Sequence, residues 1–291
     1  MPSFSNKKYL KIIVTLGVST FNATGADTIT LQGFRTSVYI DKAGGVQMSS
    51  LRARIYGVSQ HDMNAITTLQ WKPKLLIPNT VEVFAIDGNA ESLVFAGNII
   101  NAWGNYHAMP DVFLEIQAQA AYWARLKPIP PKSFKGNIDV ATAMKLLADD
   151  MGMSFEPNNV SVQLRDVYLP GTALDQAKEL ARMANIDMYI DDNTLALTNQ
   201  YEPRNRKVPL ISPDTGMVGY PTFDGIGINT NILYNPAIIF GGPILVDTDV
   251  VPARGPWVVS SVAHRLDAET PHGAWFSSVR GNLNGLAVTS R

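Results

Sequence analysis

The residues best suited to metal binding or proton transfer are the four histidines, His61, His107, His264 and His272. No two of them have the i, i+4 spacing of a helical metal site, and none lies in a zinc-protease motif. The chain contains no cysteine, which excludes disulfides, thiolate metal ligands and a cysteine nucleophile. We therefore predict no metal centre. His264 lies in an apolar run typical of a strand, and we expect it to have a structural role.

Acidic residues offer a second route to chemistry. Two adjacent pairs occur, Asp149-Asp150 at the end of an expected helix and Asp191-Asp192 in an expected turn. Because neighbouring side chains on such elements point apart, we interpret both pairs as solvated polar surface rather than as acid–base pairs. Asp111 and Glu115 are isolated, no motif surrounds either, and no Gly-x-Ser-x-Gly sequence occurs. The sequence predicts no catalytic residue and no cofactor.

Glycine pairs and tryptophans are weak signals of ligand binding here. Gly225-Ile226-Gly227 lacks the third glycine and the following helix of a dinucleotide loop. Gly241-Gly242-Pro243 lacks the lysine and the hydroxyl residue of a phosphate loop, and a tight turn explains it. The tryptophans are scattered, which favours packing in a core or at subunit interfaces over a sugar-binding platform. They are Trp71, Trp103, Trp123, Trp257 and Trp275.

Residues 1–127 carry mainly strand signals. Short β-branched or alternating runs lie at residues 10–14, 37–40, 51–56, 81–86 and 93–97. In the third of these runs Leu51, Ala53 and Ile55 are expected to share the buried face. The sequence Asp87-Gly88 indicates a hairpin, which we expect to have a loop longer than two residues.

One helix is expected in this first region. Ser59 with Asp62 resembles a capping box, and the helix face that follows comprises Met63, Ile66 and Leu69. We therefore interpret residues 1–127 as a small antiparallel β-barrel with a single helix.

The pattern changes after Pro128, Pro130 and Pro131. Asp139 is expected to cap a helix that ends at Gly152, and Thr172 opens a second helix. Residues 160–164 alternate as a strand, and residues 187–190 and 194–197 predict a hairpin around a polar turn. Residues 128–206 are thus predicted to form an α/β insert module, which could be trimmed or varied without destroying the β-domains.

Strand signals return in residues 207–291, with many glycines and prolines between them. The expected strands cover residues 217–218, 226–228, 231–234, 244–246, 257–259 and 275–279. Strands before and after an insert predict a mainly β protein with two β-domains flanking an α/β module.

Composition narrows the class of function. Only 17% of the 291 residues are charged, below the usual quarter, which suggests that other subunits cover part of the surface. The net charge of −1 argues against a dedicated nucleic-acid binder. The start lacks a secretory apolar stretch, and the most apolar tract, residues 232–246, is interrupted by proline and glycine. We expect a soluble protein.

Three stretches, in their order and spacing, resemble the hub family of contractile injection machines, which includes baseplate hubs of contractile-tailed phages and the late-control-D and VgrG-type hubs. The first stretch runs through residues 51–57 and 81–85 to Phe95-Ala96-Gly97-Asn98-Ile99. The second is the insert, from residues 171–186 into the acidic turn of residues 189–195. The third comprises residues 216–222, 233–236, 257–259, 264–267 and 273–275.

The resemblance implies two tail-tube-like antiparallel β-barrels, in residues 1–127 and 207–291, that are structural copies of one another. It implies a homotrimer in which three chains present six similar units between the tail tube and a central spike. The tape-measure protein would be a further partner, and DNA would pass through the lumen without specific binding. The expected location is the virion baseplate, after synthesis in the host cytoplasm. The candidate interface residues are Tyr220, Pro221, Phe223, Tyr234, Asn235 and Pro236.

Two other functions stay open at the level of sequence. A surface or carbohydrate-binding β-protein would need its aromatic side chains clustered on one exposed face. A tail-associated peptidoglycan hydrolase would need a catalytic carboxylate such as Asp111 or Glu115 in a groove.

Overall fold

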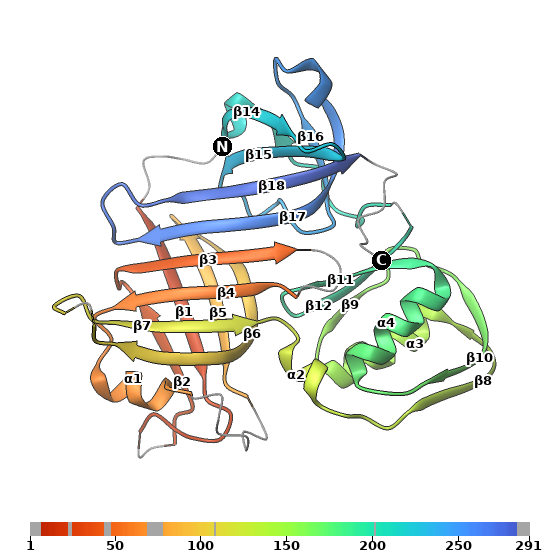
Figure 1. Ribbon diagram of the computed structural model, residues 1–291, viewed down its shortest axis with the longest axis horizontal. Coiled ribbons are helices and arrows are strands. Elements are labelled where there is room, and N and C mark those ends of the chain that lie inside the picture. The colour runs from red at the N-terminus through yellow and green to blue at the C-terminus, as the bar shows by residue number, and fades with distance from the viewer. Residues whose placement is uncertain are drawn as a thin grey trace.

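The computed structural model describes residues 7–22, 25–43, 48–68, 78–107, 109–200 and 202–283. As Figure 1 shows, most strands belong to one large sheet, and the α/β insert lies to one side of it. Within the described residues the large sheet has 13 strands, beside a sheet of three strands and a sheet of two. No helix of this part of the chain is long and apolar enough to cross a membrane.

The first region contains seven strands and two short helices. The strands are β1 (Lys8–Thr15), β2 (Thr28–Gln32), β3 (Thr36–Ala43), β4 (Ser50–Tyr56), β5 (Thr80–Asp87), β6 (Ala90–Asn105) and β7 (Phe113–Gln119). The helices are α1 (Gln60–Ile66) and α2 (Tyr122–Leu126). The predicted strands and the predicted start of α1 are confirmed. The Ser59 hydroxyl accepts a hydrogen bond from the Asp62 amide at 3.1 Å, as a helix cap should. Leu69 lies outside the described residues.

Two expectations for this region were wrong. The hairpin between β5 and β6 has a loop of only two residues, because Asp87 pairs directly with Ala90. Gly88 adopts a φ of 62°, which the first central position of a type II′ turn requires and which glycine adopts without steric cost. The second error is α2, a five-residue helix that the sequence analysis did not predict.

The insert has its own strands and helices, and its hydrophobic core also includes Met48, Ala120, Ala121 and Ala124 of the first region. Its elements are β8 (Lys132–Asp139), α3 (Val140–Met151), β9 (Ser154–Glu156), β10 (Gln163–Leu169), α4 (Ala173–Ala184), β11 (Ile186–Asp191) and β12 (Thr194–Asn199). Both predicted helices are confirmed with their caps, since the Asp139 and Thr172 side chains accept amide hydrogen bonds and Gly152 ends α3 at a φ of 70°. The predicted strand at residues 160–164 begins instead at Gln163, and β8 was missed because its side chains are largely polar.

The third region contains β13 (Leu210–Ile211), β14 (Met217–Phe223), β15 (Gly227–Leu233), β16 (Pro243–Val246), β17 (Gly255–Ala268) and β18 (Trp275–Leu283). Two short 3-10 turns, η1 (Pro213–Thr215) and η2 (Val251–Ala253), lie between them. The two strands expected on either side of residue 230 are one continuous strand, β15. The stretch around Trp257 and the run that contains His264 likewise merge into β17.

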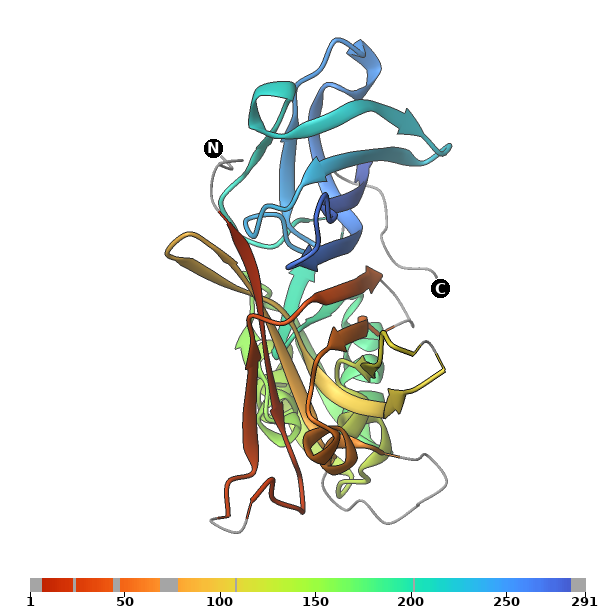
Figure 2. The ribbon, with the colours of Figure 1, turned by 90° about the vertical axis from the view of Figure 1, so that its left-hand side faces the viewer.

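The predicted mainly β fold is confirmed, but the described residues form one large sheet and no closed barrel in place of the two predicted β-barrels. Hydrogen bonding runs from β14 through β15, β18, β17, β3, β4, β7, β6, β5 and β1 to β2, so that both β-regions share one open sheet. β1, β2 and β5 pass behind the layer of β3, β4, β7 and β6, as Figures 1 and 2 show. The apolar side chains of both layers form the core between them, including Ile12, Ile40, Ile55, Val83 and Ile116. In the first region the sheet therefore bends back on itself to form two layers with the core between them.

The two β-regions repeat one strand order. In the first region the neighbours are β3-β4-β7-β6, and in the third they are β14-β15-β18-β17. If the four strands of each set are numbered in chain order, both sets place the first, second, fourth and third side by side, and all six pairings are antiparallel. β5 and β16 add to β6 and β17 in equivalent ways. This is the common order of four antiparallel strands that duplication of one unit predicts.

The two copies are joined by a ladder between β17 and β3. The pairing is antiparallel and extends from Ser261 opposite Ala43 to Ala268 opposite Thr36. The third strand of one copy thus lies beside the first strand of the other. The chain consequently presents one continuous sheet of eight strands across both copies.

Candidate functional site

The histidines form no common site. The described residues contain no group of three or more histidine or acidic side chains that could hold a metal ion. His61 Nε2 lies 2.8 Å from the carbonyl oxygen of Phe21. His264 is buried, and its Nδ1 lies 2.8 Å from the Ser277 hydroxyl. Burial lowers the pKa of His264 to about 3, so the ring is neutral, as expected of a histidine packed in a core.

The two carboxylates that a hydrolase would need do not form a catalytic pair. Glu115, on β7, is buried, and its oxygens lie 3.9 Å and 3.7 Å from the guanidinium Nε atoms of Arg52 and Arg54. Asp111 is exposed and pairs with Arg35 at 2.8 Å. In the part of the chain that the structure describes, each carboxylate therefore faces arginine, and the two do not pair with each other as glycoside hydrolysis would require.

The largest concentration of buried charge contradicts an expectation from the sequence. Asp191 and Asp192 are not solvated surface, because both contact the ammonium of Lys42, at 2.8 Å and 2.7 Å. Lys42 belongs to β3 and is 6% exposed. Asp191 ends β11, while Asp192 has a left-handed φ of 53°. This backbone conformation brings two consecutive carboxylates to the same lysine.

Arg204 extends this cluster into the third region. Its guanidinium contacts Asp191 at 2.9 Å, Glu156 at 2.9 Å and the carbonyl oxygen of Phe240 at 3.0 Å. Arg206 pairs with the other oxygen of Glu156. We call these six residues the junction: Lys42, Glu156, Asp191, Asp192, Arg204 and Arg206. It balances three positive against three negative charges and ties the insert to both β-regions.

The junction also shifts the pKa values of its members. Burial lowers the pKa of Lys42, but Asp191 and Asp192 more than reverse this and the net shift is upward. Burial raises the pKa of Asp191, and Lys42 and Arg204 outweigh it, so that the pKa is lowered. Burial and the neighbouring Asp191 carboxylate raise the pKa of Asp192 to about 6, against the attraction of Lys42. Although both carboxylates contact Lys42, the pKa of Asp191 is lowered and the pKa of Asp192 is raised.

A second contact between the β-regions centres on Tyr234. Its hydroxyl lies 3.0 Å from the Ser92 hydroxyl of β6, and its ring packs edge-on against His264 and Trp275. Burial raises the pKa of Tyr234. This side chain therefore packs within the chain, in the core that includes Trp275, rather than on an outer surface.

The other candidate interface residues are divided between surface and interior. Tyr220 is 67% exposed and Phe223 is 53% exposed, both on β14. Pro221 between them is buried, Asn235 is half-buried and Pro236 is exposed. The structure thus brings Tyr220 and Phe223 to one exposed strand and separates them from the buried Tyr234. Their role in an interface stays a prediction.

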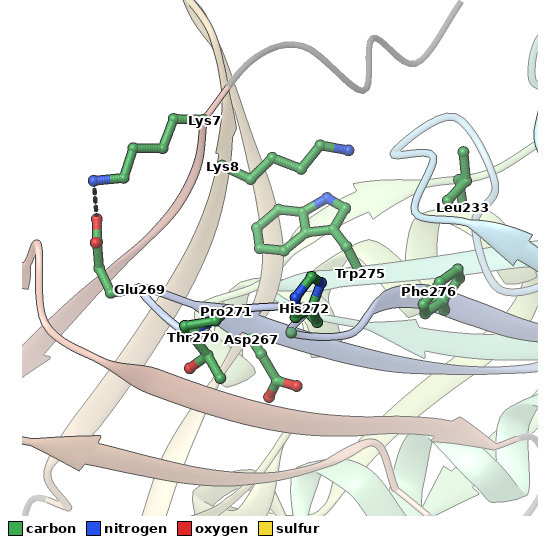
Figure 3. Close-up of a pocket in the computed structure, with 11 residues that line it drawn as sticks. Lys7, Lys8, Leu233, Asp267, Glu269, Thr270, Pro271, His272, Trp275 and Phe276 are labelled. Carbon is green, nitrogen blue, oxygen red and sulfur yellow. Dashed lines mark ion pairs between the residues drawn. The ribbon is translucent and has the colours of Figure 1, made fainter.

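An open pocket of about 580 Å³ lies beside the turn between β17 and β18 (Figure 3). On one side Lys7 pairs with Glu269 at 2.7 Å, a hydrogen bond that raises the pKa of Lys7. The ammonium of Lys8 lies 5.7 Å from the centre of the Trp275 ring. Asp267 accepts a hydrogen bond from a backbone amide of the turn at 2.8 Å. Lys7, Lys8 and Asp267 therefore make structural contacts with other groups and do not pair with one another as an acid and a base.

Three solved structures share the fold of this chain. A tail protein from Neisseria meningitidis MC58 aligns with a TM-score of 0.64 at 11% identity, over 96% of this chain and 98% of that one. The 43 kDa tail protein of prophage MuSo2 from Shewanella oneidensis gives 0.61 at 8% identity, over 95% and 96% of the two chains. The E. coli c3393 protein, a type VI secretion component described as similar to T4 tail proteins gp27 and gp5, gives 0.53 at 9% identity, over 86% and 73%.

The fold is accordingly that of tail proteins of phages and related injection machines. The family model described as baseplate hub gp41 matches residues 18–271. The chain belongs to this baseplate hub family and is a structural component of a phage-type tail baseplate. No curated protein shows significant similarity to the chain.

Proposed function

We propose that three copies of this baseplate hub protein form a ring that joins the tail tube to the central spike. Each chain supplies two similar β-units, so three chains present six. The partners of the ring are the tail-tube subunits on one side and the spike on the other, with the tape-measure protein inside the tube. DNA passes through the ring during ejection without specific binding.

The observation that carries this proposal is the repeated strand order in one continuous sheet. A sixfold tube and a threefold spike can meet without distorting subunits when each of three subunits contains two copies of one unit. The shared order of β3-β4-β7-β6 and β14-β15-β18-β17 supports two such copies, and the ladder between β17 and β3 holds the two sets of strands side by side.

The polar face of the eight-stranded sheet suits the wall of a channel. Alternate residues of β4 and β17 face away from the core, among them the exposed Arg52, Arg54 and Arg265. The carboxylate of Glu115 lies near the first two and offsets part of their charge. A wall without a large excess of positive charge would not hold the phosphate backbone of DNA, because such binding scales with the number of neutralised phosphates.

The trimer is tested by light scattering after size exclusion, on the chain alone and with its tail partners. We expect three times the chain mass. Replacing the exposed Phe223 by aspartate should weaken the trimer, because a charge would be buried in an apolar contact. Tyr168→Asp is the matched control, since Tyr168 is 61% exposed on β10 of the insert. A wild-type chain that is monomeric in both conditions contradicts the proposal.

The structure gives no support to the two competing functions. Trp257 and Trp275 are buried, and Trp103 and Trp123 are half-buried, so these four do not form an exposed sugar platform. Trp71 lies outside the described residues. Zymography on peptidoglycan tests the hydrolase, and we expect no cleared zone. A zone that the wild type clears and that Glu115→Gln or Asp111→Asn abolishes would overturn the assignment as a purely structural protein.

A further inference from the structure

Two edges of the repeated sheet lack a full partner strand among the described residues. β14 pairs with β15 alone. Residues 101–105 of β6 pair with β7 on one side. On the other side helix α1 packs against β6, and the described backbone pairing is a single bridge, in which the Thr68 amide donates a hydrogen bond to the Ala102 carbonyl. Strand edges that lack a full partner strand can pair with another chain.

Pairing register shows which residues of β6 and β17 are equivalent. β6 has an irregularity between Ile99 and Asn101 where it pairs with β7, and β17 has one between Val259 and Ser261 where it pairs with β18. Aligning the two irregularities makes residue 99 equivalent to residue 259. On this alignment Gly104 of β6 corresponds to His264 of β17, and Asn105 corresponds to Arg265.

The same procedure relates β14 to β3. In the first copy Leu51 lies between Ile40 on β3 and Ala118 on β7. In the second copy Ile228 lies between Phe223 on β14 and Gly281 on β18. Ala118 and Gly281 are equivalent, because they pair with the equivalent residues 99 and 259. Phe223 therefore corresponds to Ile40, and Thr222 corresponds to Tyr39.

Within the chain, β17 of one unit pairs with β3 of the next, with His264 opposite Ile40 and Arg265 opposite Tyr39. A ring of equivalent units repeats this contact between chains. We infer that β6 of one chain pairs antiparallel with β14 of a second copy, with Gly104 opposite Phe223 and Asn105 opposite Thr222. The inference rests on the proposed ring and specifies how its subunits are joined.

The side chains at these positions allow an aromatic contact. The ring of Tyr106 covers Gly104, so the exposed ring of Phe223 would pack beside Tyr106 when its strand lies opposite Gly104. The ladder must be short, because Thr68 contacts the edge at Ala102 and Pro221 has no amide hydrogen to donate. The contact between chains is therefore weaker than the eight-residue ladder between β17 and β3.

The absence of cysteine from the chain makes a direct test possible. Asn105→Cys and Thr222→Cys in one chain should form disulfides between chains under mild oxidation, giving covalent species that end at three chains. The control pair is Thr30→Cys with Thr222→Cys, because Thr30 is an exposed residue of β2, the strand at the opposite end of the hydrogen-bonded order. This second pair should not cross-link.

Light scattering under reducing conditions tests the trimeric ring separately from the β6–β14 pairing. A trimer in which only the 30/222 pair cross-links, or in which neither pair does, contradicts the β6–β14 pairing and leaves the ring intact. A monomeric wild-type chain contradicts both. If the cysteine variants do not assemble, hydrogen exchange on the wild-type trimer decides, since the amides of Gly104 and Asn105 should exchange at least tenfold more slowly than in the dissociated chain. Equal exchange in the two states overturns the pairing.

Discussion

The first β-unit (β3-β4-β7-β6) and the second β-unit (β14-β15-β18-β17) share a strand order, but they differ in the elements that surround those four strands. Leu51, Ala53 and Ile55 of β4 are buried, and so are the residues at the equivalent positions of β15, 228, 230 and 232. Between its second and third ladder strands the first unit has helix α1, whereas residues 234–242 of the second unit contain only turns and no helix. β1 and β2 add a second layer to the first unit, where the second unit has the two-residue strand β13.

This difference shows where the duplication is constrained. In the proposed ring the four ladder strands are retained in both units because each must offer matching edges to its neighbour. The layer behind them makes no such contact in the proposed ring and can change. Lys42 and His264 lie within the ladder, but their counterparts in the other unit are Gly225 and Gly104 by the alignment of registers. These two positions therefore distinguish the units chemically.

Removing Lys42 should have the largest effect of the changes proposed here. Lys42→Met would leave Asp192 without a cation and Asp191 with Arg204 alone. Breaking a buried ion pair in this way costs about 3–5 kcal/mol, because one charge stays buried without compensation. Urea denaturation followed by circular dichroism measures the loss.

Lys132→Met is the control for that variant. Lys132 pairs with Asp150 at 2.7 Å on the surface of the insert, and such exposed pairs contribute at most about 1 kcal/mol. Equal losses in the two variants would show that the junction does not hold the insert to the first unit.

The pH dependence of the unfolding free energy should report on His264, a buried histidine that is present in the second unit and is glycine in the first. Its folded-state pKa of about 3 lies below the unfolded value of about 6.5, so only the unfolded chain gains a proton between these values. The contribution of His264 is complete above pH 6.5 and decreases as the pH falls, by about 2 kcal/mol at pH 5. Asp192 acts in the opposite sense, because its pKa is raised to about 6 and its contribution is lost as the pH rises through that value.

Comparing the wild type with His264→Asn separates the contribution of His264 to the pH dependence from that of Asp192. The unfolding free energy of the wild type should fall by about 2 kcal/mol more than that of His264→Asn between pH 7 and pH 5. Parallel pH profiles for the two proteins would mean that His264 is not buried in its neutral form.

Helix α1 provides the smallest effect, confined to the first unit. Ser59→Ala removes the hydroxyl that accepts a hydrogen bond from the Asp62 amide, and it should lower the unfolding free energy by about 1 kcal/mol. Ser59→Gly should cost only a few tenths of a kcal/mol, because glycine is itself a favourable residue at this position. Thermal or urea unfolding measures both, and a larger loss for glycine than for alanine would argue against the cap.

Local patterns in the sequence predicted the elements but not how they join. Alternation at Leu51, Ala53 and Ile55 identified β4, and hydroxyl or carboxylate residues before apolar helical periods identified the starts of α1, α3 and α4. These signals are local, since each depends on neighbours within about four residues. The sharing of one sheet by both units depends on the pairing of β17 with β3, which lie more than 200 residues apart in the chain.

The junction was missed for the same reason. Asp191-Asp192 was noticed, but the cations that neutralise it come from β3 and from the segment after β12. The signal that could have indicated burial was the placement of two carboxylates between strands made mainly of apolar residues, followed by Arg204 and Arg206 in a polar exit segment. Sequence alone does not show which lysine on a distant strand completes such a cluster.

The most direct test of the duplicated hub is an image of the assembled protein along its channel axis. Averaged electron micrographs of the purified trimer should show a ring with a central hole and six similar densities, produced by three chains according to the mass. The two kinds of density should alternate, with the α1-bearing unit larger than the other. A ring with only three separated densities, or a compact particle without a hole, would contradict the conclusion that the two β-units of each chain are equivalent parts of one ring.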